Sequence, residues 1–219
     1  MGRRRRSFAI LVGLVAALTL ASSAAAASPW LSIRQNGVSA VAQRLDCTDI
    51  GDTTLSCEAE LLAAFKGTIK ITGSPTAHTD LVCYERLSAT LDADTGEIID
   101  ASSMAGCALD TGTVRVRSLG SIVLGSTVVD LVTLTCDEVD CTERPAGQVT
   151  VRGSWSSAGR PMVSRLKFRF DEGICTDVLA SQARVREARF RGSVNGAGMG
   201  SDLALVGAGT IRIRSRCTT

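Results

Sequence analysis

Apolar and polar residues alternate along much of the chain. Four runs begin at a glycine and then place a β-branched apolar residue at every second position: 67–72, 112–117, 147–152 and 209–214. Because successive side chains of a strand point to opposite faces, this spacing predicts strands with one buried and one solvated face. Longer stretches rich in β-forming residues predict further strands, at 81–92, 121–136, 162–170 and 182–194.

The segments between these stretches carry turn residues. Leu91 to Ile98 contains Asp92, Asp94 and Gly96, and predicts a hairpin in which the glycine supplies a positive φ. The segment Glu58 to Lys66 is the one stretch that we interpret as a short helix. Sheets with one apolar face must bury it against another layer. The predicted fold class is therefore all-β, an antiparallel sandwich or a barrel-like sheet.

Two parts of the chain resemble each other at an offset of 80 residues. Gly67, Ile69, Ile71, Gly73 and Ser74 recur as Gly147, Val149, Val151, Gly153 and Ser154. A duplication would explain this, giving two related β units at about 28–135 and 136–219. The alternative is that a glycine followed by alternation is simply how strands begin, and the cysteines do not repeat at this offset.

The first residues have the pattern of a secretory signal peptide. Four arginines (Arg3–Arg6) precede a short apolar run, 8–20, and small residues end in Ala25 and Ala27. We expect cleavage after Ala27, which leaves a soluble domain of residues 28–219. A membrane anchor is the alternative, but the apolar run is shorter than the roughly 20 residues that a spanning helix needs. The expected location is outside the cell, in the cell envelope or in the periplasm.

All eight cysteines lie after the predicted cleavage site. An even number of cysteines behind an export signal indicates disulfides. Zinc is the competing interpretation, but the tightest pair, Cys136 and Cys141, is too widely spaced for the usual motif, and His78 is the only histidine. We expect pairing in chain order, as Cys47–Cys57, Cys83–Cys107, Cys136–Cys141 and Cys175–Cys217.

No catalytic motif stands out in the sequence. The segment from Gly153 to Gly159 has the wrong glycine spacing for a serine nucleophile elbow, and His78 lies in a loop-like segment. Carboxylates gather in three places and could serve a glycosidase-like reaction or bind calcium; solvated turns are the alternative. These are Asp46, Asp49 and Asp52; Asp92, Asp94 and Glu97; and Asp137, Glu138, Asp140 and Glu143. We assign no catalytic residue, metal site or cofactor.

Aromatic platforms would indicate sugar or single-stranded nucleic acid binding. The mature chain has few aromatic residues, and most should be in the core. Trp155, within a Gly/Ser-rich segment, is the best candidate for an exposed one.

Basic residues at every second position are the most distinctive feature. Arg165, Lys167 and Arg169 would share one strand face, and so would Arg212, Arg214 and Arg216. Shorter pairs occur at Arg115/Arg117, Arg184/Arg186 and Arg189/Arg191. Residues 28–135 carry 7 basic and 13 acidic residues, whereas 136–219 carry 13 and 9. If the strands are neighbours, their solvated faces form a basic stripe that suits phosphate and carboxylate groups.

These observations favour a non-catalytic envelope or extracellular module, for binding or structure. The expected partner is an anionic polymer or another envelope component, bound through the two arginine-rich rows. One alternative is a carrier of a small ligand in an internal cavity. The other is a secreted hydrolase that uses paired carboxylates.

Overall fold

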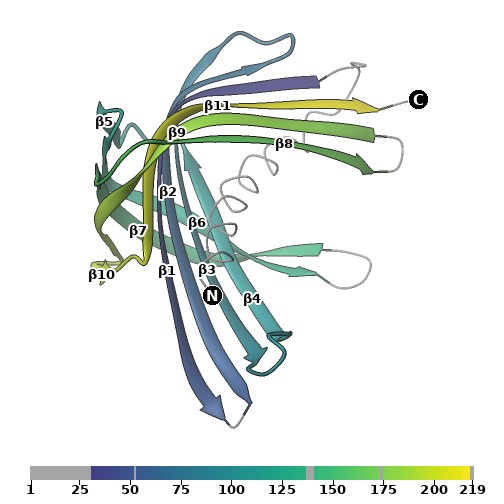
Figure 1. The fold of residues 1–219 in the computed structure, drawn as a ribbon, viewed down its shortest axis with the longest axis vertical. Coiled ribbons are helices and arrows are strands. Elements are labelled where there is room, and N and C mark those ends of the chain that lie inside the picture. Colours follow the sequence, from purple (N-terminus) through teal and green to yellow (C-terminus); the bar gives the residue numbers. More distant parts are fainter. Residues whose placement is uncertain (1–30, 52, 137–140, 173–174, 218–219) are drawn as a thin grey trace.

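A computed structural model describes residues 31–51, 53–136, 141–172 and 175–217, and the predicted signal peptide lies outside them. The described chain contains strands and no helix, and eleven strands form one antiparallel sheet (Figure 1). This confirms the predicted fold class. The strands are β1 (Leu31–Gly51), β2 (Thr54–Ile71), β3 (Ala77–Asp92), β4 (Ile98–Leu109), β5 (Val114–Ser118), β6 (Ser121–Cys136), β7 (Cys141–Ser157), β8 (Met162–Glu172), β9 (Cys175–Val194), β10 (Ala197–Met199) and β11 (Leu203–Cys217).

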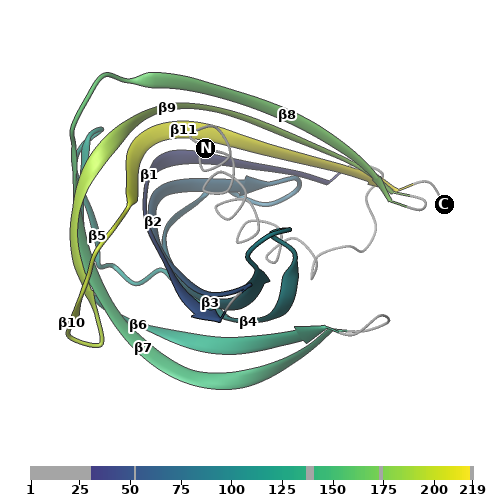
Figure 2. The same cartoon turned by 60° about the horizontal axis from the view of Figure 1, so that its bottom comes forward.

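Eight of these strands form a closed hydrogen-bonded path, which we call the ring. Its order is β9-β11-β1-β2-β3-β4-β6-β7, and β7 pairs with β9 again through Val151 opposite Val194. The strands wrap around a common interior in the view of Figure 2. β8 and β10 pair with β9, and β5 pairs with β6. The long β9 therefore joins the two ends of the sheet.

Side chains fill the centre of the ring. Leu62 and Val82, from β2 and β3, are fully buried together with Ile122 and Trp155, from β6 and β7. Burying an aliphatic side chain of this size stabilises a fold by about 1.5–3 kcal/mol. The core thus lies between the wall that contains β1, β2 and β3 and the wall that contains β6 and β7.

Glycines lie in a row across β2, β1 and β11, where these strands change direction. Gly37 of β1 is paired with Gly67 of β2 and with Gly209 of β11. A Cβ at Gly67 would lie 2.7 Å from the Cα of Gly37 and 2.7 Å from the ring of Phe65. Glycine in a strand often marks such a bend. Beyond the row, the sheet continues as an arm made of β8 and the adjoining parts of β9, β11, β1 and β2 (Figure 1).

Glu58 to Lys66 is part of β2, so the helix prediction was wrong. Leu61 and Leu62 point to opposite faces of the sheet, and both are buried. A strand that is covered on both faces has apolar residues at consecutive positions, and a short run of this kind resembles a helical pattern. The hairpin prediction was right: β3 and β4 are joined by a turn in which Gly96 has φ 73°.

Trp155 was predicted to be the best candidate for an exposed aromatic residue, and this was wrong. It is 1% exposed, and its ring lies 4.9 Å from that of Phe190, between centroids. Gly153 and Gly192 are paired beside these rings, and a Cβ at Gly153 would lie 2.7 Å from Phe190. The glycines that resemble a loop in sequence therefore make room for two aromatic side chains within the sheet.

Two predicted disulfides are present. Cys47–Cys57 links β1 to β2, and Cys83–Cys107 links β3 to β4. Strand register also places the backbone of Cys136 opposite Cys141 and that of Cys175 opposite Cys217. Their side chains are not among those described, so these two bridges stay predictions. The two bridges that are described indicate an oxidising, extracellular type of environment.

The proposed boundary between two β units, at 135/136, falls inside β6. Residues 67–71 form the end of β2, whereas the matching residues 147–151 lie within β7. The duplication stays a prediction.

Candidate anion-binding face

The two predicted basic rows lie on the same face of the arm. β9 separates β8 from β11, and it pairs with both. Ala180 of β9 is opposite Lys167 on one side and Arg212 on the other. Side chains of residues paired across antiparallel strands point to the same face. The two rows are therefore separated by a single strand, β9, which places the small Ala180 between them.

Further basic residues, from distant parts of the sequence, extend this face. Arg34 of β1 is paired directly with Arg212 and, on its other side, with Lys70 of β2. Arg184 of β9, which belongs to one of the shorter predicted pairs, lies two residues from Gln182, the partner of Arg165. We call the following set the basic face: Arg34, Lys70, Arg165, Lys167, Arg169, Arg184, Arg212, Arg214 and Arg216.

Sequence reasoning missed Arg34 and Lys70 as site residues. Within the arm, neither residue has a second basic residue two positions away on its own strand. The i, i+2 pattern that identified the other rows is therefore missing for both. Only the register of β1 against β11 and β2 shows that they continue the row of Arg212.

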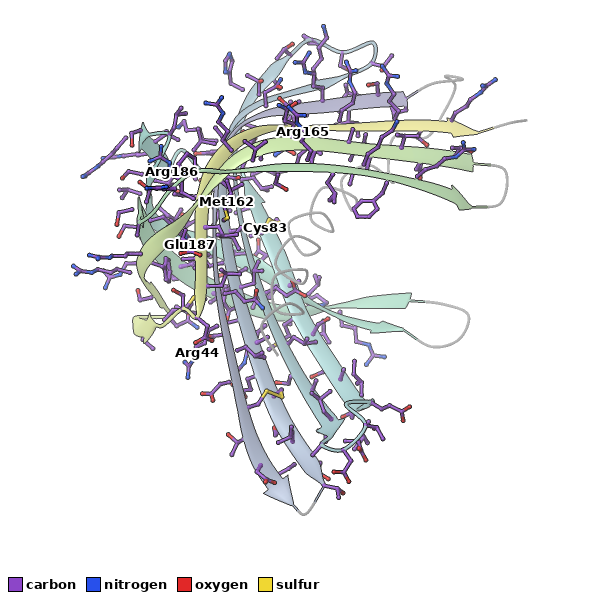
Figure 3. The ribbon with its side chains drawn as sticks, viewed as in Figure 1. Arg44, Cys83, Met162, Arg165, Arg186 and Glu187 are labelled. Atoms are coloured by element: carbon purple, nitrogen blue, oxygen red, sulfur yellow. A yellow bond between two sulfur atoms is a disulfide. The ribbon has the colours of Figure 1, made fainter. Side chains whose placement is uncertain are left out.

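All nine residues of the basic face are exposed. Strand geometry separates charges at i and i+2 by about 6.7 Å, and adjacent strands lie about 4.8 Å apart. Several groups of one linear polyanion could therefore contact the face at once. Figure 3 labels Arg165 on this arm.

The charged positions of the basic face are mainly of one sign. Both ion pairs given by the described residues, Arg44–Asp46 and Arg86–Glu58, lie elsewhere. The Nε of Arg34 donates to Asn36 at 3.3 Å, which is a neutral partner. Arg169 and Arg216 each make an interaction. In backbone register, Asp171 of β8 follows Arg169 by two residues and is opposite Thr176, the partner of Arg216. The other described register positions of this face in β8, β9, β11, β1 and β2 are not acidic.

The opposite face of the same strands is apolar. Ile33 is paired with both Ile71 and Ile213, and Ile213 with Leu179. Leu179 is in turn opposite Phe168 of β8. A slip of one residue would exchange the two faces, so this apolar row fixes the arginines on the solvated side.

The other basic pairs are separate from this face. Arg115 and Arg117 are exposed on β5, at another edge of the sheet. Arg189 and Arg191 lie where β9 pairs with β7, on the side of β9 opposite to Arg184 and Arg186. His78 is exposed at the start of β3, opposite Thr68.

The carboxylate clusters do not form a paired-acid site among the described residues. Burial raises the pKa of Glu85, but its register partners are Leu61 and Ala105. Hydrogen bonds from Thr95 lower the pKa of Asp92, whose Oδ1 also accepts the backbone N–H of Asp94. This carboxylate therefore organises its own turn. No group of His, Cys, Asp and Glu in the described part of the chain could hold a metal ion.

Comparison with protein families, with characterised proteins and with solved structures found no match to this chain. Within the residues that the structure covers, no helix is long and apolar enough to cross a membrane.

Proposed function

We propose that this chain is an exported, non-catalytic module that binds an anionic polymer through the basic face. The main support for this proposal is the strand register. It aligns four basic residues from four strands across one exposed face, namely Lys167, Arg212, Arg34 and Lys70. Guanidinium groups form two parallel hydrogen bonds with phosphate or carboxylate. Because Lys167, Arg212, Arg34 and Lys70 are exposed, their donors are accessible to a ligand.

Export is part of this proposal. The N-terminal signal pattern supports it, and so do two disulfides, which persist in oxidising compartments. The polymer would then belong to the cell envelope or to the extracellular surroundings. N-terminal sequencing of the chain recovered outside the cell should begin at Ser28.

The direct test is titration of the chain with inorganic polyphosphate at several salt concentrations. Arg212→Glu with Arg214→Glu should weaken binding by at least about tenfold, because two attractive contacts become repulsive. Arg115→Glu with Arg117→Glu is the matched control, since it makes the same charge change in an exposed i, i+2 pair on β5. Equal losses in both variants would show a response to net charge alone and would contradict the proposal.

A further inference from the structure

A second candidate site lies at one end of the ring, on the side where β10 lies. A cavity of about 410 Å³ opens there, lined by residues of β1, β2, β3, β4, β6, β7, β9 and β10. Pockets commonly form in the mouths of sheets closed in this way, and this volume falls in the range of small-molecule sites. Figure 3 labels Arg44, which lines this mouth.

One wall of the mouth is a row of alternating hydrogen-bonding groups. Glu60 of β2 is paired in register with Arg44 of β1 and with Arg86 of β3. The row thus presents a donor, an acceptor and a donor on adjacent strands, about 4.8 Å apart. Below it, the buried Tyr84 donates its hydroxyl hydrogen to Oε1 of Glu60 at 2.8 Å.

Other described residues occupy only part of the hydrogen-bonding capacity of this row. Arg44 contacts Asp46 through Nη2, and Arg86 contacts Glu58 through Nη2 as well. The Nε and Nη1 groups of both arginines have no partner among the described residues. Tyr84 donates to Oε1 of Glu60, and Oε2 of Glu60 has no hydrogen-bond partner among the described residues. Donors and an acceptor therefore remain side by side at the mouth.

The facing wall is largely apolar. Leu131, Val194 and Met199 line it together with Gln148 and Asn195, and Leu131 and Met199 are also buried in the core. Met104 of β4 is opposite Arg86 in register and adds an apolar side chain to the first wall. Two hydrogen bonds between Asn195 and Thr150 hold the β9–β10 turn against β7. This wall would accept the hydrocarbon part of a ligand.

From these two walls we infer that the mouth binds one small amphiphile with a neutral, hydroxyl-rich head and an apolar body, of the alkyl glycoside class. A hydroxyl group both donates and accepts, so neighbouring hydroxyls can accept from Arg44 and Arg86 and donate to Glu60. A carboxylate head cannot donate to Glu60 and is repelled by it. An ammonium head cannot accept from the two arginines, whose charges are already paired with Asp46 and Glu58. The apolar body lies against Met104, Leu131 and Met199.

The test compares three amphiphiles that share an eight-carbon tail, namely octyl glucoside, octanoate and octylammonium, each below its micelle concentration. Calorimetric titration of the full mature chain should give one site for octyl glucoside. The two charged amphiphiles should bind about tenfold more weakly or worse, because a carboxylate cannot donate to Glu60 and an ammonium group cannot accept from Arg44 or Arg86. Tyr84 is the only tyrosine in the chain, so its near-ultraviolet absorption reports occupation of the site.

Two variants locate the binding. Arg44→Glu, on an exposed part of β1, should lower the affinity for octyl glucoside by about tenfold. Glu60→Gln should raise the affinity for octanoate relative to that for octylammonium, because it removes the negative charge of Glu60 from the row. Arg212→Glu with Arg214→Glu should leave both results unchanged, which separates this site from the basic face. Absence of any binding, or octyl glucoside binding that Arg44→Glu does not alter, would overturn the inference, with circular dichroism used to verify that each variant is folded.

Discussion

Gly67 shows how a single residue permits the bend of the sheet. A methyl group there would meet the carbonyl oxygen of Asn36, the Cα of Gly37 and the ring of Phe65. We predict that Gly67→Ala lowers the free energy of unfolding by about 1–3 kcal/mol, as overpacking typically does. Urea unfolding measures this value. Gly51→Ala is the control, since a methyl group there meets nothing within 4 Å; an equal loss in both variants would contradict this account of the bend.

Tyr84 gives a second prediction at the residue scale, for alkaline pH. Burial raises the pKa of its hydroxyl well above the ordinary value of about 10, and the hydrogen bond to the charged Glu60 raises it further. Below pH 10 the phenol is protonated in both the folded and the unfolded states, so it contributes no pH dependence. Above pH 10 only the unfolded state ionises, so stability should fall as pH rises, by at most about 1.4 kcal/mol per pH unit from this group.

Because the chain has a single tyrosine, tyrosinate absorbance follows this group directly. The folded protein at about pH 11 should show little tyrosinate, and unfolding by urea at that pH should make it appear. Glu60→Gln should shift the folded-state titration toward the ordinary value without reaching it, because burial remains. Ionisation of the folded protein at the ordinary tyrosine pKa would contradict the buried hydrogen bond.

At the scale of strands, alternation predicts where strands occur but not how they pair. The runs at 67–72, 147–152 and 209–214 all lie wholly or largely in strands. Register depends on contacts between residues far apart in sequence, so Arg34 could not be assigned to the row of Arg212 from its own strand. Local pattern also fails where both faces are covered, as in β2, where consecutive leucines resemble a helix.

The two described disulfides link different pairs of strands and should differ in how much they stabilise the fold. Cys83–Cys107 spans 24 residues and Cys47–Cys57 spans 10. A cross-link that closes a longer loop restricts the unfolded chain more. We predict that Cys83→Ala with Cys107→Ala costs about 2–4 kcal/mol, and that Cys47→Ala with Cys57→Ala costs roughly 1 kcal/mol less. Thermal and urea unfolding of the two double variants test the order, and a reversed order would contradict it.

At the scale of the whole molecule, closure of the ring could not be predicted from the sequence. It depends on β9, which pairs with β11 and β8 along one part and with β7 and β10 along another. The uneven charge of the two halves was visible in the sequence, but the fold does not keep the halves apart. Arg34 and Lys70, from the acidic N-terminal half, join basic residues of the C-terminal half on one face. The basic face is therefore a product of topology as well as of composition.

This mixing leads to a prediction about electrostatics. If the basic face binds a linear polyanion as a unit, the logarithm of the affinity should fall linearly with the logarithm of salt concentration, because each contact releases counterions. Arg34→Gln and Lys70→Gln should each lower the steepness of that dependence by about one contact, as much as Arg165→Gln does. Polyphosphate titrations of the three single variants over a salt series measure this, with Arg117→Gln on β5 as the control. If Arg34→Gln and Lys70→Gln left the slope unchanged while Arg165→Gln reduced it, the polymer would contact only β8 and β11, and the five-strand row would have no role in binding.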